Sequence, residues 1–151
     1  MAVYSQYSDD ENRALDLWVK LARAFGAFSR RSQEHIRSCG LTPSQFAVLE
    51  CLGHKGEMTL GELSTKMLMS CGNMTVVVDN LEKEGLVERN RSASDRRVIH
   101  VSLTPSGKAL FDQHFPDHAQ LIARLAKVLS PHEQVELALL LKKLGHALKD
   151  A

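Results

Sequence analysis

The feature of this 151-residue sequence that most limits its fold is a helix-start pattern that occurs four times. In each case a Ser or Thr is followed three residues later by Glu or Gln. At this spacing the two side chains satisfy free backbone N–H groups in the first turn of a helix. Proline at the first helical position strengthens two of these starts and marks a fifth after Thr104. The sequence therefore predicts a mainly α-helical chain. The four pairs are Ser8 and Glu11, Thr42 and Gln45, Thr59 and Glu62, and Ser130 and Glu133.

Length and composition narrow the class of protein further. A chain with 44% hydrophobic and 25% charged residues can fill a core, so we expect a single domain over residues 1–151. The longest apolar run, residues 137–141, is far shorter than the roughly 20 residues of a membrane-spanning helix, and no membrane partner is expected. The polar, acidic start of the chain does not resemble a signal peptide, and the three cysteines have no paired spacing. Both observations favour a cytoplasmic protein.

The middle of the chain, residues 41–103, is expected to begin with two short helices. The first should occupy residues 43–53, because Gly53 and Gly56 interrupt the helical pattern there. The second should follow the cap at Thr59 and run for about eight residues, a length set by the next break in apolar spacing.

A tight turn and a third helix come next. Residues 69–72 interrupt the apolar pattern, which returns at Met74 and continues to Leu81. Gly85 suits the left-handed position that often follows the end of a helix. Helix, tight turn and helix in this order predict a helix-turn-helix, whose second helix enters the major groove of DNA.

Two strands should complete this part of the chain as a hairpin. Apolar and polar residues alternate over residues 86–90 and 98–103, and the connection between them is too long for a two-residue turn. That connection is basic. We therefore predict a wing whose tip faces phosphate. The wing region holds four arginines, Arg89, Arg91, Arg96 and Arg97, against the single carboxylate of Asp95.

The segments 1–40 and 104–151 carry more apolar surface than one chain can bury. A first helix at roughly 9–38 has two apolar stripes, of which one can face its own core while the second needs a partner. The last helix shows a similar excess, and Pro116 should kink the helix predicted at 105–128. We expect these helices to form a homodimer. The stripes comprise Leu15, Trp18, Ala22 and Phe25, and Leu17, Leu21, Ala24 and Phe28.

The second helix of the helix-turn-helix offers several groups for DNA. Asn73 suits a bidentate contact to adenine, Val76 suits a thymine methyl group, and Asn80 shares their face. Ser70, with the free N–H groups of the first turn, suits a phosphate.

Positive charge is scarce on this helix, which has no Lys or Arg before Lys83. This absence shifts the expected phosphate neutralisation to the wing and to Lys66. Arg96 or Arg97 at its tip is the candidate for a narrow minor groove, where the negative potential is strongest.

The stretch 71–111 resembles the MarR (multiple antibiotic resistance regulator) family. The resemblance lies in NLEKEGLVER at 80–89, DRR at 95–97 and LTPSG at 103–107. It implies a winged helix-turn-helix flanked by N- and C-terminal dimerisation helices. It also implies a regulator, often a repressor, that leaves a pseudo-palindromic operator when a small molecule binds. By position, the resemblance places on double-stranded DNA the residues Ser70, Cys71, Asn73, Thr75, Val76 and Asn80, and Arg97 on the wing. The basic cluster of the wing adds Arg91 and Arg96 as candidates for DNA contact.

The resemblance further implies an effector site between the dimerisation helices and the winged helix. Aromatic walls with an imidazole and a hydroxyl suit a phenol or benzoate. The residues at 115–118 and 144–145 are similar to those of the branch that includes regulators of quinone or hydroxybenzoate stress. The candidate effector-binding residues are Phe28, Ser32, His35, Ile36, Phe46 and His118.

Other signals and another class of protein stay open. Cys71 lies where the helix dipole favours a thiolate, so it is a candidate for oxidation. His114 and His118 have the i, i+4 spacing of a metal pair, although no metal or cofactor is expected. A winged helix that binds protein is compatible with the net charge of +1. We expect no enzyme, because no Cys/His or Ser/His set has a recognisable catalytic context.

Overall fold

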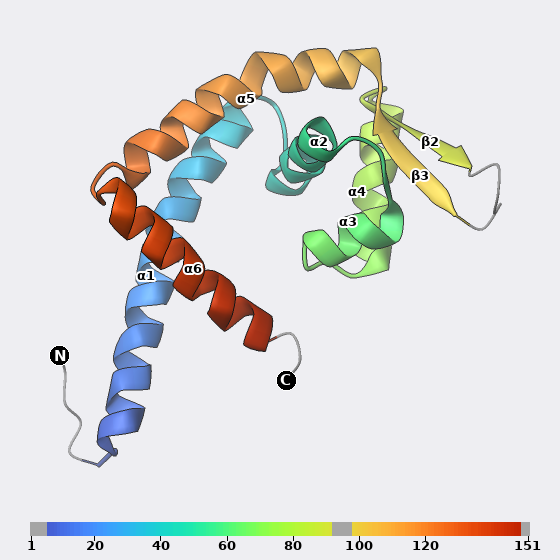
Figure 1. The fold of residues 1–151 in the computed structure, drawn as a ribbon. Helices are drawn as coiled ribbons and strands as arrows, with labels where there is room; N and C mark the ends of the chain where they lie inside the picture. Colours follow the sequence, from blue (N-terminus) through green and yellow to red (C-terminus); the bar gives the residue numbers. More distant parts are fainter. Residues whose placement is uncertain (1–5, 92–97, 149–151) are drawn as a thin grey trace. The chain divides into compact units, whose positions relative to one another are not determined.

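The computed structural model describes residues 6–91 and 98–148, which form six helices and a small antiparallel sheet (Figure 1). This confirms the expected mainly helical fold with a β wing. The chain divides into two compact units, Met1–His118 and Ala119–Ala151. In chain order the elements are α1 (Asp9–Ser38), α2 (Pro43–Lys55), β1 (Met58–Thr59), α3 (Leu60–Lys66), α4 (Cys71–Lys83), β2 (Val87–Arg91), β3 (Ile99–Leu103), α5 (Pro105–Ala126) and α6 (Pro131–Ala147).

All four predicted capping boxes form, at the starts of α1, α2, α3 and α6. At α3, for example, the backbone N–H of Thr59 donates to the Glu62 carboxylate over 2.8 Å, and the Glu62 N–H donates to the Thr59 hydroxyl over 3.2 Å. These local bonds explain why the helix starts were predictable from the sequence. α4 instead uses a single cap, because Ser70 accepts from the N–H of Asn73.

The sheet contains one strand more than the predicted hairpin. Its order is β1-β3-β2, with Val87 opposite Leu103 and Arg91 opposite Ile99. The added strand β1 pairs Met58 with Val101. Because β1 has only two residues, it carries no alternating pattern that a sequence reading can detect.

The prediction that Gly53 helps to end the second helix was wrong. Helix α2 continues through Gly53 to Lys55, and Gly56, at φ +78°, provides the break. Gly53 is instead a point of close packing, since a Cβ built there would lie 2.7 Å from the ring of Phe111. Position 53 therefore favours glycine because a larger residue would clash with Phe111, and not because the chain turns there.

The core of the first unit lies within the winged helix. Side chains from α2, α3, α4, β2 and β3 meet there and exclude solvent almost completely. The largest fully buried side chains are Leu63, Met74, Leu81, Val48, Val78, Val87 and Val101. Because α4 contributes three of them, its orientation is set by hydrophobic packing.

A group of hydrogen bonds fastens the end of α4 to the start of α5. Gly85 takes the predicted left-handed conformation at φ +70°. The Thr104 hydroxyl donates to the Gly85 carbonyl over 2.6 Å, and the Thr104 N–H donates to the Leu86 carbonyl over 3.1 Å. A Cβ on Gly107 would lie only 1.9 Å from the Leu86 oxygen, so a side chain has no room there. We refer to Gly85, Leu86, Thr104 and Gly107 as the wing-base joint.

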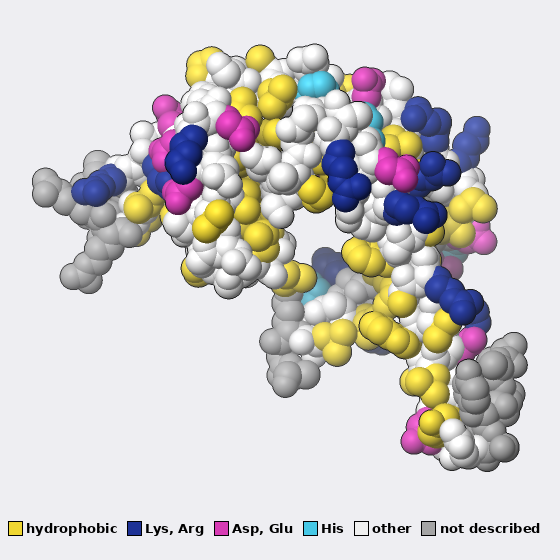
Figure 2. All heavy atoms as spheres, turned by 180° about the vertical axis from the view of Figure 1, so that it is seen from behind, with side chains coloured by type: hydrophobic (Ala, Val, Ile, Leu, Met, Phe, Trp, Pro, Cys, Tyr) yellow, Lys and Arg dark blue, Asp and Glu magenta, His cyan; other side chains and the backbone are white. Residues whose placement is uncertain are grey.

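Neither apolar stripe of α1 is buried, contrary to the expectation that one would face the core. Of all residues in α1, only Asn12 and Ile36 are buried. Trp18 is 65% exposed and Phe25 is 70% exposed. Figure 2 shows hydrophobic side chains along this helix, between charged ones. The long helix therefore presents an extended apolar surface.

In the second unit, α6 contains no buried residue. Its exposed leucines include Leu137, Leu139, Leu140 and Leu141.

Within the described ranges, no helix is both long enough and apolar enough to cross a membrane. α5 stays helical through Pro116.

Candidate nucleic-acid interface

Helix α4 has one fully buried face and one exposed face. Met74, Val78 and Leu81 are each 0% exposed and anchor the helix in the core. Their spacing of three to four residues places them on one side of the helix. Side chains on the opposite side therefore stand away from the protein.

The DNA-contacting residues predicted on α4 are all exposed. Val76 is 59% exposed, so its side chain is free to contact a partner. The Thr75 hydroxyl donates to the backbone carbonyl of Cys71 over 2.9 Å, so its proton is already used within the helix. The exposed set is Ser70, Cys71, Asn73, Thr75, Val76 and Asn80.

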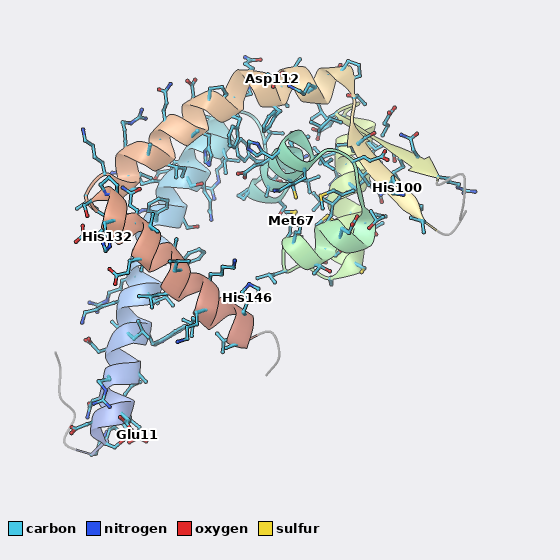
Figure 3. The ribbon with its side chains drawn as sticks, viewed as in Figure 1. Glu11, Met67, His100, Asp112, His132 and His146 are labelled. Atoms are coloured by element: carbon cyan, nitrogen blue, oxygen red, sulfur yellow. The ribbon has the colours of Figure 1, made fainter. Side chains whose placement is uncertain are left out.

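The wing supplies one further predicted residue within the described part of the chain. Arg91 is exposed at the end of β2. Arg96 and Arg97 lie outside the described residues. On the neighbouring strand β3, His100 lies with its Nδ1 3.8 Å from a carboxylate oxygen of Glu57 (Figure 3).

The structure places the Arg89 side chain differently from the sequence prediction. The sequence assigns Arg89 to the basic wing cluster, but its guanidinium contacts α4. Nη1 lies 2.6 Å from Asp79 and 2.7 Å from Glu82, and Nη2 donates to the Thr75 carbonyl over 3.3 Å. The Arg89 side chain is only 19% exposed. The two acids, three residues apart on α4 and just before the strand, were the available signal for this contact.

Three of the predicted effector residues lie together in the first unit. The ring of His118, on α5, lies 4.7 Å from that of Phe46 on α2 and 5.3 Å from that of His35 on α1, measured between centroids. Ile36 is buried in the core next to this cluster. Phe28 is 39% exposed on α1, and Ser32 is half-buried there. We refer to His35, Phe46 and His118 as the aromatic junction.

His118 is a buried polar side chain, 7% exposed. Among the described residues its Nδ1 has no hydrogen-bond partner. Burial lowers the pKa of His118, and the neighbouring His35 lowers it further. A neutral imidazole with a free nitrogen in an aromatic setting is able to pair with a hydroxyl or carboxyl group of a ligand.

The structure bears on both the metal alternative and the redox alternative. The described residues contain no group of three His, Cys, Asp or Glu side chains that could hold a metal ion. Among these residues, no third side chain of this kind joins the pair His114 and His118, and the metal alternative stays a hypothesis. Cys71 is a free, exposed thiol at the start of α4, so oxidation there stays a hypothesis.

Comparison with known proteins identifies the family of this chain. The MarR family profile matches residues 41–99, which cover the helix-turn-helix and β2 and end at the first residue of β3. The HTH-type transcriptional regulator MhqR of Bacillus subtilis is 39% identical over 133 residues, covering 88% of this chain and 92% of MhqR. The chain belongs to the MarR family of transcriptional regulators.

Solved MarR-family structures extend the likeness to the fold. A mutant of E. coli MarR complexed with operator DNA is 30% identical, with a TM-score of 0.77 and coverage of 91% of this chain and 99% of that one. Bordetella bronchiseptica BpsR, whose DNA binding is regulated by 6-hydroxynicotinic acid, is 28% identical, with a TM-score of 0.76 and coverage of 86% and 98%. These two relatives bind operator DNA and respond to a small aromatic acid, respectively.

Proposed function

We propose that this MarR-family regulator is a cytoplasmic homodimer that represses transcription by binding a pseudo-palindromic operator, and that a small aromatic or phenolic effector releases it. The observation that carries the proposal is the exposed face of α4, where Asn73, Val76 and Asn80 stand opposite a fully buried face. An amide and an apolar side chain match the donor, acceptor and methyl pattern of A·T pairs in the major groove.

The exposed apolar surface of α1 supports the homodimer. Trp18 and Phe25 are both more than half exposed, and an extended apolar surface on a helix is expected to be covered in solution. A two-fold dimer presents its two recognition helices about one helical turn of DNA apart, which explains the expected pseudo-palindrome.

The aromatic junction supports the effector. Its three side chains come from α1, α2 and α5, so a ligand there would bear on both the long helix and the winged helix. The unpaired Nδ1 of His118 matches a phenol or carboxyl group. The response of the relative BpsR to a hydroxylated aromatic acid agrees with this chemistry.

A mobility-shift assay on DNA from the region upstream of the protein's own gene tests the proposal. We expect binding that weakens steeply as salt rises, because phosphate contacts release counterions. Hydroxybenzoate or a hydroquinone should release the DNA. A protein-binding winged helix would instead show no specific shift.

Matched variants separate the possible signals. His118→Gln should keep DNA binding and lose release by the aromatic effector, whereas Cys71→Ser should keep that release. Peroxide-induced release that disappears in Cys71→Ser would favour the redox alternative, and release by zinc would favour the metal one. Titration calorimetry that detects no binding of any phenol, quinone or aromatic acid would rule out the aromatic effector.

A further inference from the structure

Arg89 joins strand β2 of the wing to one flank of the recognition helix. It does so through three groups on α4, the Thr75 carbonyl and the carboxylates of Asp79 and Glu82. These residues follow the spacing i, i+4 and i+7, which places them in a row along one side of a helix. Arg89 also gives its backbone N–H to Glu82 over 3.3 Å. A single residue of the wing therefore holds two turns of α4.

The charge of α4 makes this contact significant. Its charged side chains are Asp79, Glu82 and Lys83, so the helix alone has more negative than positive charge. Asp79 directly precedes Asn80 of the exposed face, and its side chain is 43% exposed. A free carboxylate at that place would face the phosphates of a bound DNA and repel them.

We propose that Arg89 is a positioning residue for DNA binding, which keeps the two carboxylates of α4 turned away from the phosphate backbone and fixes α4 to the wing. This inference rests on the proposed binding of DNA. It assigns Arg89 a different task from Arg91, two residues further along the same strand and exposed. The planar guanidinium suits the task, because it offers several donors in a fixed fork.

The experiment compares the effect of removing Arg89 in two backgrounds. DNA affinity and its salt dependence are measured for the wild type, Arg89→Ala, the double variant Asp79→Asn/Glu82→Gln, and the triple variant that combines all three changes. The duplex is the upstream DNA described above. Circular dichroism at the assay temperature establishes the folded fraction of each variant, so that affinities refer to folded protein.

We expect Arg89→Ala to weaken DNA binding about tenfold or more, because unpaired like charges at an interface are costly. The salt slope, which is the slope of log affinity against log salt concentration, should equal that of the wild type, since no phosphate contact is lost. In the neutral background the same change should have little effect, and the triple variant should bind nearly as well as the double variant. Arg91→Ala is the matched control, for which neutralising Asp79 and Glu82 should not restore binding.

Three results would overturn the inference. Equal loss in both backgrounds, together with a salt slope smaller by about one, would make Arg89 a phosphate contact. Unchanged affinity of folded Arg89→Ala would limit Arg89 to a role in stability. A wild-type protein that binds neither the upstream duplex nor an unrelated one at low salt would refute the proposed function as well, and this result is distinct from the other two.

Discussion

The ring of Phe111 lies directly against the backbone of Gly53, so that a Cβ on Gly53 would be 2.7 Å from its Cζ atom. Phe111 in turn stacks on Phe115 at 5.0 Å between ring centroids. The contact joins α2 of the winged helix to α5, the helix that carries His118.

Gly53→Ala should destabilise the protein by about 1–3 kcal/mol, because overpacking forces neighbouring groups to move. Phe111→Leu combined with it should recover part of the loss by vacating the space. Chemical denaturation measures both effects. The control is Gly72→Ala, where a Cβ meets nothing within 4 Å and the helix should gain up to about 1 kcal/mol. Equal effects at Gly53 and Gly72 would contradict the close packing.

The capping box of α3 should make part of the stability depend on acid pH. Hydrogen bonds from the backbone N–H and hydroxyl of Thr59 hold the pKa of Glu62 below its usual value. The folded state therefore favours the carboxylate, and this stabilisation is present above about pH 4.3 and lost as the pH falls through the lowered pKa. Melting temperatures of Glu62→Gln and the wild type should differ at pH 6 and converge at pH 3. A difference that does not change with pH would refute the prediction.

The burial of His118 should make stability depend on pH in the same direction as Glu62, but in a higher pH range. Burial, and then the nearby His35, lower the pKa of His118 in the folded protein. The unfolded chain therefore binds a proton more readily, and stability is lost as the pH falls below about 6.5 towards the lowered pKa. His118→Phe should reduce the fall in unfolding free energy between pH 7.5 and pH 5.5. An equal fall in both proteins would show that His118 does not carry the effect.

Side chains on α4 and the wing should affect DNA binding in different ways. Asn73→Ala should cost about 1–3 kcal/mol on the preferred sequence and little on unrelated DNA, because a base contact carries sequence information. Arg91→Ala should weaken binding to all sequences and lower the salt slope by about one. Binding titrations on both duplexes at several salt concentrations compare the two variants. A uniform loss for Asn73→Ala would contradict its assignment to a base.

The exposed surface of α1 should determine the oligomeric state. Phe25→Glu places a charge where the wild type has a 70% exposed aromatic side chain, so it should shift a dimer towards monomer. Sedimentation velocity measures the change. Arg13→Glu, near the start of the same helix, is the control and should leave the dimer intact. A monomeric wild type would refute the proposed homodimer.

The parts of the fold that local chemistry determines could be predicted from the sequence. A capping box depends on two side chains three residues apart, and all four boxes form as expected. The left-handed Gly85 and the buried face of α4 follow from equally local patterns. The strand β1 and the close packing at Gly53 depend on distant partners, Val101 and Phe111, and no local pattern contains that information.

The candidate sites show the same division between features set by local patterns and features set by distant partners. Residues on the exposed face of α4 were predictable, because helical spacing fixes which side chains face away from the core. The contact of His35 and Phe46 with His118 agrees with the family resemblance. The sequence assigns Arg89 to the basic cluster because further arginines follow it from Arg91 onward, while its partners Asp79 and Glu82 belong to another element.

The wing-base joint has a mechanical consequence. Thr104 bonds to Gly85 and Leu86, which follow the end of α4, and Gly107 permits no gap between Leu86 and α5. We therefore expect the joint to transmit motion, so that a rotation at the start of α5 would turn α4 as well. A small displacement of α5 would then change the angle at which α4 meets the proposed operator.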